Sequence, residues 1–549
     1  MNFKGVEKEK NAVLILAAGY KAYDNSFILN EPFLNIGNTL IIERIKKKCN
    51  TQNKIYIAVN NFPKSLQKLK SFDECNFINV GITFGVVDTI KKSIQFIKEN
   101  FINIIPITTI PDNSFTKEKS IYFGNKEMSK ENWSGISQIN NEKIEYFFKK
   151  EEIDFKKKCY PFTGRISSVK DDIREAANEL IDEQMHDLLY LGKILIEKYK
   201  HRIINEKWYD AGHKSTYFET KISFFSCRFF NEIRYNHERN SIIKTSKDNL
   251  KLNKEINFYK IIPSNLKLFF PNVLNEYKEE KEVLELEYLS YPNLAEIFLF
   301  RKVGANRWEN IVKSLFEIYK EFYLKNQSKG FLSNASHLYS KKLQIRTNEL
   351  NTIIDNMNNN LLKEIKNKGI KVNNNDLPSL NKTINEIQEN LRDIEERRPL
   401  FFGHGDLCFN NILIEPISGS IKLIDPKAES LGNSKIGYID PFYDLAKLNH
   451  SFSCFYDSIV NNMFSLKKNE SQYELEIYKP FNYEIANFYF QKIFLTNLID
   501  KELLRILTSN LFLSMIPLHK ENQQKMCAFL IIGISLYYNI DMENYILKI

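Results

Sequence analysis

The chain has 549 residues, 26% of them charged and 43% hydrophobic, and its formal net charge at pH 7 is +9. One hydrophobic core does not serve a chain of this length, so two to four domains are expected. A positive charge spread this thinly suits phosphate-bearing small ligands, and neither a dense basic stripe nor a nucleic-acid motif points to nucleic acid as a partner.

The seven cysteines are scattered singly, without a CxxC pair and in an odd total. This pattern argues against a disulfide framework or a zinc site and favours a reducing compartment. The apolar stretches 12–18 and 527–538 are too short to span a bilayer, and the first residues lack a signal-type apolar run. We therefore expect a cytoplasmic protein with no membrane span.

Residues 1–200 alternate apolar, strand-like runs with helical patterns. Strands are predicted over 12–16, 54–59 and 102–107, and helices over 40–48 and 86–99. Such alternation predicts an α/β domain with a mostly parallel sheet, whose ligand lies at the carboxyl ends of the strands.

Small residues follow the first predicted strand at once, in the order Leu16, Ala17, Ala18 and Gly19. With the segment PFLNIGN at 32–38, they resemble the start of a sugar-phosphate nucleotidylyltransferase. The resemblance implies a GT-A or Rossmann-like nucleotidylyltransferase-like domain over 1–200, with a pocket for a nucleotide-sugar or sugar phosphate.

The same segment departs from the family pattern in its charged groups. Glu31 stands where a lysine is expected, and the stretch 104–111 lacks the metal-binding aspartate, so that Asp112 is the nearest carboxylate. Nucleotidyl transfer needs both groups. These departures favour a binding domain without the reaction, and an altered catalytic set that uses Lys21 and Asp112 is the alternative.

Four further segments carry weaker patterns. Residues 159–165 are interpreted as a strand–loop boundary rather than a pocket-lining turn, and 171–200 as one long helix. The aromatic and polar stretch 208–217 favours an interdomain joint over a ligand site. Residues 217–235 are predicted to form a strand pair.

Phosphoryl-transfer chemistry is concentrated in 401–427, FFGHGDLCFNNILIEPISGSIKLIDPK. Two apolar runs around Pro-x-Ser-Gly-Ser within 411–424 predict a β-hairpin. Asp406, Asn411 and Asp425 then lie at the ends of short strands. Phosphoryl transfer needs one carboxylate to orient and deprotonate a hydroxyl, and an amide and a second carboxylate to hold Mg²⁺.

The motif His404-Gly405-Asp406-x-x-x-x-Asn411, followed by Ile-Asp425-Pro, resembles the catalytic loop and metal-binding turn of the aminoglycoside phosphotransferase and choline kinase family. These enzymes are distant relatives of protein kinases. The resemblance implies that Asp406 is the catalytic base, that Asn411 and Asp425 bind magnesium, and that His404 braces the loop.

By the same resemblance, Lys244 on a strand at 241–245 would hold the ATP phosphates, and Glu255 on the following helix would pair with it. Backbone groups of Glu287 and Leu289 would contact adenine. Asp444 would be the buried aspartate that steadies the catalytic loop.

The implied fold is an α+β bilobal protein-kinase-like domain, with a junction and N-lobe over 201–290 and a helical C-lobe over 291–549. The Asn/Lys-rich stretch 334–395 is expected to be a helical insertion with a loose loop, which either shapes the acceptor pocket or is a solvated spacer.

These features predict an ATP- and Mg²⁺-dependent phosphotransferase that acts on a hydroxyl of a small molecule, a sugar or amino-alcohol. The chain is similar to phosphotransferases of bacterial capsule biosynthesis, which implies a role in surface polysaccharide synthesis. Two alternatives stay open: a bifunctional kinase and nucleotidylyltransferase that makes an NDP- or CDP-activated precursor, and a non-catalytic nucleotide-binding scaffold.

Overall fold

The computed structural model divides the chain into two compact units, Met1–Phe224 and Phe225–Ile549. The structure describes residues 11–18, 27–28, 31–50, 53–129, 133–139, 143–148, 158–224, 231–246, 249–278, 282–325, 329–357, 360–427, 430–431, 435–469, 472–496 and 500–548.

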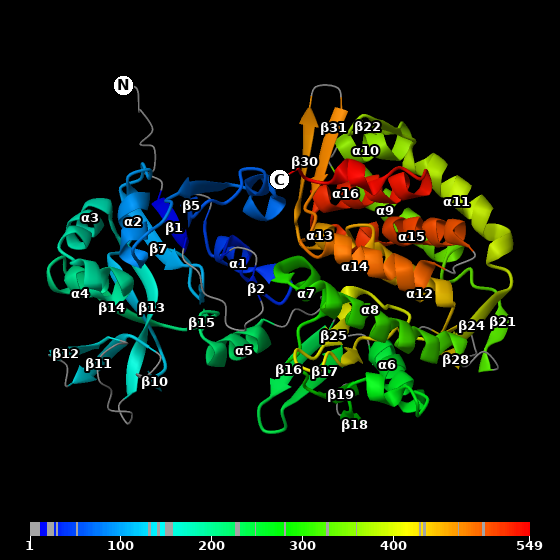
Figure 1. Cartoon of the computed structure of the whole chain (residues 1–549), viewed down its shortest axis with the longest axis horizontal. Helices are drawn as coiled ribbons and strands as arrows, with labels where there is room; N and C mark the ends of the chain where they lie inside the picture. Colours follow the sequence, from blue (N-terminus) through cyan, green and yellow to red (C-terminus); the bar gives the residue numbers. More distant parts are fainter. Residues whose placement is uncertain are drawn as a thin grey trace. The chain divides into compact units, whose positions relative to one another are not determined.

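Unit 1 is a mixed α/β structure around a partly parallel sheet (Figure 1). Strand β1 (Asn11–Ala17) lies between β5 (Asn53–Val59) and β7 (Phe101–Pro106), parallel to both, and β6 (Cys75–Asn79) extends the parallel part. All seven β1 residues are buried, which is why this strand is a continuous apolar run. The predicted strands at 12–16, 54–59 and 102–107 are confirmed to within a residue at each end.

The sheet continues beyond β7 in antiparallel strands. The strand order is β12-β11-β13-β7-β1-β5-β6, and β13 pairs with β7. The remaining strands of unit 1 are β2 (Phe27–Ile28), β3 (Asn35–Ile36), β4 (Thr39–Leu40), β8 (Thr109–Pro111), β9 (Ser120–Gly124), β10 (Met128–Ser129), β11 (Gly135–Ile139), β12 (Lys143–Phe147), β13 (Lys158–Val169), β14 (Arg202–Glu206) and β15 (Trp208–Asp210).

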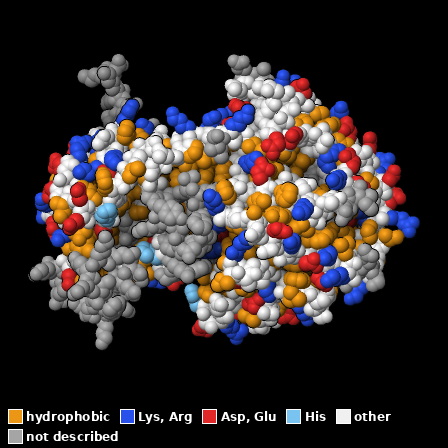
Figure 2. Space-filling view, viewed as in Figure 1, with side chains coloured by type: hydrophobic (Ala, Val, Ile, Leu, Met, Phe, Trp, Pro, Cys, Tyr) orange, Lys and Arg blue, Asp and Glu red, His pale blue; other side chains and the backbone are white. Residues whose placement is uncertain are grey.

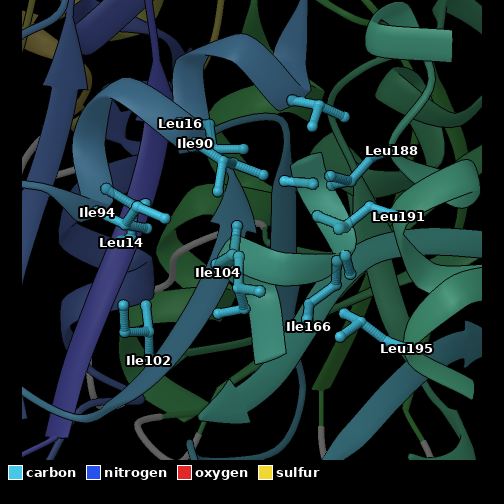
Figure 3. Packing of buried hydrophobic residues seen from close by; sticks show 14 of the residues in the cluster. Leu14, Leu16, Ile90, Ile94, Ile102, Ile104, Ile166, Leu188, Leu191 and Leu195 are labelled. Carbon is cyan, nitrogen blue, oxygen red and sulfur yellow. The ribbon is translucent and has the colours of Figure 1, made fainter. Parts of the chain in front are cut away.

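Helices pack their apolar faces on this sheet. Figure 3 shows Leu14 and Leu16 of β1 beside Ile94 and Ile90 of α2 (Val86–Ile94), and the same buried cluster includes Ile104 of β7 and Leu191 of α4 (Leu188–Glu197). The other helices of unit 1 are α1 (Ile41–Lys46), α3 (Lys170–Asn178) and α5 (Lys214–Ser223). The predicted helices at 40–48 and 86–99 are confirmed as the shorter α1 and α2.

The single long helix predicted over 171–200 is wrong. The structure has two helices, α3 and α4, separated by the 3-10 turn Asp182–His186. Asp187 ends this turn and begins α4, because its side chain accepts a hydrogen bond from the amide of Leu189 at 2.9 Å. The apolar spacing continues across the break, so periodicity alone did not reveal this cap.

Residues 159–165 are neither a strand end nor a pocket-lining turn, because they lie inside the long strand β13. The pairing of β13 with β9 shifts register between Phe162 and Ile166, and Gly164 between them has φ +77°. The Pro/Gly signal therefore marks a β-bulge rather than a boundary.

The strand pair predicted over 217–235 is also wrong, because 217–223 belong to α5. Asp210 builds the start of this helix: its Oδ2 accepts hydrogen bonds from the His213 amide at 2.8 Å and from the Thr216 hydroxyl at 2.5 Å. Among the described residues of the predicted span, β16 (Asn231–Asn236) is the one strand.

Unit 2 begins with a four-stranded antiparallel sheet in the order β16-β17-β19-β18, against which α6 (Asn249–Ile261) packs. The strands are β17 (Ser241–Ser246), β18 (Val273–Lys278) and β19 (Glu282–Glu287). The predicted lysine strand and the helix that follows it are confirmed.

The rest of unit 2 is mainly helical (Figure 1). Its helices are α7 (Leu294–Phe300), α8 (Ala305–Tyr319), α9 (Ser340–Asn356), α10 (Asn360–Asn367), α11 (Leu380–Ile394), α12 (Pro441–Phe452), α13 (Tyr456–Val460), α14 (Tyr483–Phe490), α15 (Lys501–Met515) and α16 (Gln523–Tyr537). Its short strands are β20 (Arg301–Lys302), β21 (Phe331–Ser333), β22 (Ile370–Val372), β23 (Asn375–Leu377), β24 (Arg398–Phe402), β25 (Ile412–Ile414), β26 (Ile421–Leu423), β27 (Ser430–Leu431), β28 (Lys435–Ile436), β29 (Tyr438–Ile439), β30 (Phe464–Asn469) and β31 (Gln472–Ile477).

The predicted loose loop in the insertion 334–395 is an ordered hairpin. Strands β22 and β23 are joined by Asn373 and Asn374, which both have positive φ, a geometry that asparagine tolerates. The Asn373 side chain donates hydrogen bonds to the carbonyls of Leu475 and Asn544. The polar run is therefore a structural turn between helices, as its asparagines satisfy backbone groups.

Shortening one core side chain tests the packing of the central strand. Ile104 of β7 is fully buried, so Ile104→Ala should destabilise unit 1 by about 3 kcal/mol. Amides of β1 and β5 should then exchange with solvent about a hundredfold faster, as peptide-resolved hydrogen exchange would measure. Ile82→Ala, at a position that is 82% exposed, is the control and should change nothing. Equal exchange in both variants would contradict this packing.

Candidate functional site

The loop after β24 is held by one buried carboxylate from α12. Asp444 Oδ2 accepts hydrogen bonds from the amides of His404 and Gly405, both at 3.1 Å, and Oδ1 accepts one from the Leu407 amide at 3.3 Å. The Tyr323 hydroxyl donates a fourth bond at 2.5 Å. The side chain of Asp444 therefore fixes the backbone path of residues 403–407.

The His404 ring joins this loop to the next turn. Its Nδ1 accepts a hydrogen bond from the Asp406 amide at 3.2 Å, so Nε2 carries the proton and donates to the Ile424 carbonyl at 3.0 Å. The His404 carbonyl in turn accepts from the Lys427 amide at 2.8 Å. Both bonds flank Asp425 and hold its turn against the loop of Asp406.

The hairpin of β25 and β26 brings Asn411 and Asp425 to the same end. The Ile424 amide donates to the Asn411 carbonyl at 3.0 Å, one residue before Asp425. The Asn411 amide group donates to the Asp406 carbonyl at 2.9 Å. This bond commits the nitrogen of Asn411, so its side-chain oxygen is the atom suited to a metal ion.

Lys244 meets two carboxylates. Its Nζ lies 2.8 Å from both carboxylate oxygens of Glu255 on α6 and 2.7 Å from Oδ1 of Asp425. Burial disfavours the charged ammonium, but Asp425 and Glu255 more than offset this effect and raise the pKa of Lys244. The structure thus joins the predicted lysine–glutamate pair to the predicted metal-binding aspartate.

Glu287 and Leu289 lie at and beyond the end of β19. The Glu287 amide donates to the Asn272 carbonyl at 3.0 Å, and its carboxylate accepts from the Asn272 side chain at 2.7 Å. The Leu289 backbone makes no hydrogen bond to another residue within the described part of the chain. Leu289 therefore keeps backbone groups that a ligand could use.

Asp406 pairs with Lys447, a residue that the sequence analysis did not select. Their side chains meet at 2.9 Å and are 24% and 16% exposed. Burial raises the pKa of the Asp406 carboxyl, but the charge and hydrogen bond of Lys447 lower it well below its usual range. Lys447 follows Asp444 by three residues on α12, and this same-face spacing could have indicated it.

Tyr443 on α12 is surrounded by lysines. Its hydroxyl accepts hydrogen bonds from the ammonium groups of Lys342 at 2.7 Å and Lys427 at 3.3 Å. Burial raises the pKa of the Tyr443 phenol, but the charges of Lys342, Lys427 and Lys447 outweigh it and lower the pKa to about 8.

The residues predicted to line an N-terminal pocket are only partly described. Leu16 and Ala17 end β1 and are buried, and Ala18 follows half-buried, whereas Gly19 and Lys21 lie outside the described residues. Asp112 follows β8, and its backbone carbonyl accepts a hydrogen bond from the Lys48 ammonium.

Strand pairing brings another carboxylate to this region. Strand β15 runs antiparallel to β8 and sets Asp210 opposite Thr109, beyond the end of β7. The segment 208–217 therefore contributes β15 and the first turn of α5 within unit 1. The sequence analysis did not include Asp210 in the pocket, because no local pattern links it to Thr109.

Other classes of site find no support in the described residues. Among them, no group of three or more His, Cys, Asp or Glu side chains is arranged to hold a metal ion, and the six described cysteines are free thiols. No described helix is long and apolar enough to cross a membrane. On the face in Figure 2, basic and acidic side chains are interspersed over the described surface.

A scan against protein-family models and a search of curated proteins gave no match. Solved structures match the N-terminal part. A Bacillus anthracis protein assigned as a glucose-1-phosphate thymidylyltransferase is 14% identical, with a TM-score of 0.34, over 40% of this chain and 97% of its own. A UDP-glucose pyrophosphorylase complexed with UDP-glucose is 14% identical, with a TM-score of 0.31, over 39% of this chain and 98% of its own. HddC from Yersinia pseudotuberculosis is 14% identical, with a TM-score of 0.29, over 39% of this chain and 99% of its own.

Replacing Asp444 tests how the loop is held. In Asp444→Asn, an amide NH₂ would face backbone donors, so the loop should be destabilised by about 2–4 kcal/mol. Amides of residues 403–407 should exchange much faster in peptide-resolved hydrogen exchange. Tyr323→Phe removes only one bond and should cost about 1 kcal/mol. Asp393→Asn, at an exposed position, is the matched control, and unchanged exchange in Asp444→Asn would refute the role.

Titration of Tyr443 tests the cluster of lysines. The pKa of Tyr443 is lower in the folded than in the unfolded chain. As the pH rises from about 8 to 10, the free energy of unfolding of wild type should therefore increase by on the order of 1–2 kcal/mol relative to that of Tyr443→Phe. Tyrosinate absorbance should show one ionisation near pH 8 that Tyr443→Phe lacks. Lys342→Gln should move it to higher pH. Identical titrations of wild type and Tyr443→Phe would contradict the assignment.

Proposed function

We propose that unit 2 is an ATP- and Mg²⁺-dependent phosphotransferase that phosphorylates a hydroxyl of a small molecule, a sugar or amino-alcohol used in surface polysaccharide synthesis. One observation carries the proposal: Lys244, paired with Glu255, reaches Asp425, whose turn is hydrogen-bonded to the loop of Asp406. Positioning and electrostatics supply most of the catalysis in phosphoryl transfer, and this arrangement provides both.

The acceptor hydroxyl donates a hydrogen bond to the Asp406 carboxylate, which orients its oxygen toward the γ-phosphorus of ATP. A new P–O bond forms, the bond from the γ-phosphorus to the β–γ bridging oxygen breaks, and ADP leaves. The hydroxyl proton passes to Asp406. Lys447 keeps Asp406 ionised beforehand, so that it accepts rather than donates the hydrogen bond.

Lys244 binds the α- and β-phosphates of ATP, and Glu255 fixes the lysine by its two-oxygen contact. The backbone of Leu289, with the carbonyl of Glu287, contacts adenine. The side-chain oxygen of Asn411 and the carboxylate of Asp425 are hard ligands that fit magnesium. The ion would neutralise charge on the phosphates.

A second candidate is a bifunctional enzyme in which unit 1 activates the product as an NDP- or CDP-compound. The observation that favours it is Asp210, which the pairing of β15 with β8 sets opposite Thr109, beyond the end of a central strand. Ligands of α/β sheets bind at this edge, and a carboxylate there could hold a metal.

A screen of sugars, polyols and amino-alcohols with the full chain tests the kinase, with ADP release as the readout. Asp406→Asn should lower kcat at least about a thousandfold, because the hydroxyl loses its acceptor, while the affinity for ATP with Mg²⁺ changes less than about threefold. Asp393→Asn, an exposed and equally conservative change, should retain full activity. Equal turnover by Asp406→Asn would refute the proposed role.

Asp406→Asn and a further variant, Asp210→Asn, separate the alternatives. Pyrophosphate release from CTP or another NTP with a sugar phosphate, persisting in Asp406→Asn and lost in Asp210→Asn, would support the bifunctional enzyme. Magnesium-dependent ATP binding without turnover of any acceptor or NTP would instead establish the scaffold.

A further inference from the structure

Two lysines and a tyrosine from three separate segments converge beside the loop of Asp406. Lys342 comes from the first turn of α9, Lys427 from the turn after Asp425, and Tyr443 from α12. Since both ammonium groups donate to the Tyr443 hydroxyl, at 2.7 and 3.3 Å, their nitrogens are no more than about 6 Å apart. The two ammonium charges are therefore close enough to repel each other.

The charge of Lys342 is not explained by the protein itself. Among the described residues, its ammonium has one polar contact, the uncharged phenol of Tyr443, and no carboxylate lies within 4.0 Å of it. A half-buried cation without a counter-charge is costly. Lys342 also lies in the first turn of α9, and the N-terminal end of a helix disfavours positive charge. Helix stability therefore does not account for this lysine.

The electrostatic state of Tyr443 agrees with a positive local field. Its pKa falls to about 8 although the side chain is buried, because the surrounding lysines outweigh burial. Lys342 itself has a lowered pKa, through burial and the charge of Lys427. Both shifts have the direction that a concentration of positive charge produces.

The position of the cluster associates it with the acceptor rather than with the nucleotide. Lys244 already provides a cation for ATP phosphates and contacts Glu255 and Asp425. Lys342, by contrast, lies in the insertion between α8 and the catalytic loop. Tyr443 precedes Lys447, the partner of Asp406, by one helical turn on α12. The cluster thus adjoins the carboxylate that receives the acceptor hydroxyl.

We propose that Lys342, Lys427 and Tyr443 bind an anionic group, a phosphate or a carboxylate, on the acceptor whose hydroxyl is phosphorylated. The inference rests on the proposed kinase function and narrows its substrate to a phosphorylated or carboxylated sugar or polyol. A cationic amino-alcohol is disfavoured, because its ammonium would face like charges. Charge-assisted hydrogen bonds from two lysines suit either anion.

Kinetics with matched acceptors test this assignment in the full chain. Each sugar or polyol is offered as the neutral compound, as its monophosphate and as the corresponding acid, and ADP release is measured. The anionic forms should have the higher kcat/KM. Lys342→Gln should raise their KM at least about tenfold, with the KM for ATP unchanged, and Lys342→Arg should restore most of it. The control Lys341→Gln removes the same charge from the exposed neighbour and should behave as wild type.

The possible results separate failure of the inference from failure of the kinase proposal. Turnover of neutral acceptors that Lys342→Gln leaves unchanged, or a raised KM for ATP alone, would overturn the anion site and keep the kinase. If no acceptor is turned over, the kinase proposal fails, and calorimetric titration with inorganic phosphate decides on the anion site. Binding that Lys342→Gln abolishes and Lys244→Gln retains would support it, whereas unchanged binding in Lys342→Gln would overturn it.

Discussion

The candidate site depends on hydrogen bonds between one carboxylate and three backbone amides of one loop. Asp444 can hold the amides of His404, Gly405 and Leu407 only because α12 is itself fixed. That helix begins with Asp440, whose side chain caps the Phe442 amide at 3.0 Å and pairs with Arg398 at 2.5 Å. Because Asp444 lies one turn later, the geometry of the loop follows from the start of this helix.

In unit 2, Lys244 and Lys447 each pair with a carboxylate of the candidate site. Glu255 and Asp425 share Lys244, and Asp406 has Lys447. At Asp406 the lysine outweighs burial and lowers the pKa of the carboxyl, whereas burial outweighs Lys244 at Glu255 and raises the pKa of that carboxyl. Lys342 differs from both lysines, since its contact is a neutral phenol. This difference separates lysines that are paired with carboxylates of the protein from a lysine that is suited to bind an anionic ligand.

Local patterns predicted much of this architecture. The strands β1, β5 and β7 and the hairpin of β25 and β26 follow from short apolar runs bounded by turn residues, signals that lie within a few positions of one another. Errors arose where a polar side chain overrode the pattern. Asp187 caps the start of α4, and Asp210 accepts a hydrogen bond from the amide of His213 just before α5, and apolar spacing registers neither contact.

The candidate site was harder to predict where its contacts are remote. Lys244 and Asp425 are 181 positions apart, and only the resemblance to kinases linked them beforehand. Lys342 and Tyr443 are 101 positions apart, and neither belongs to a motif. Their meeting depends on how the insertion folds back on α12, which no local propensity encodes.

Asp425 has φ +51°, in the left-handed region where most side chains are crowded and glycine, asparagine and aspartate are the residues usually found. The backbone thus restricts which residues can occupy this position before any chemistry is considered. Asparagine would keep an oxygen ligand and lose the charge, and glycine would lose the side chain altogether. Either exchange would preserve the turn, so descendants of this protein could lose the proposed phosphoryl-transfer chemistry in one step and remain well folded.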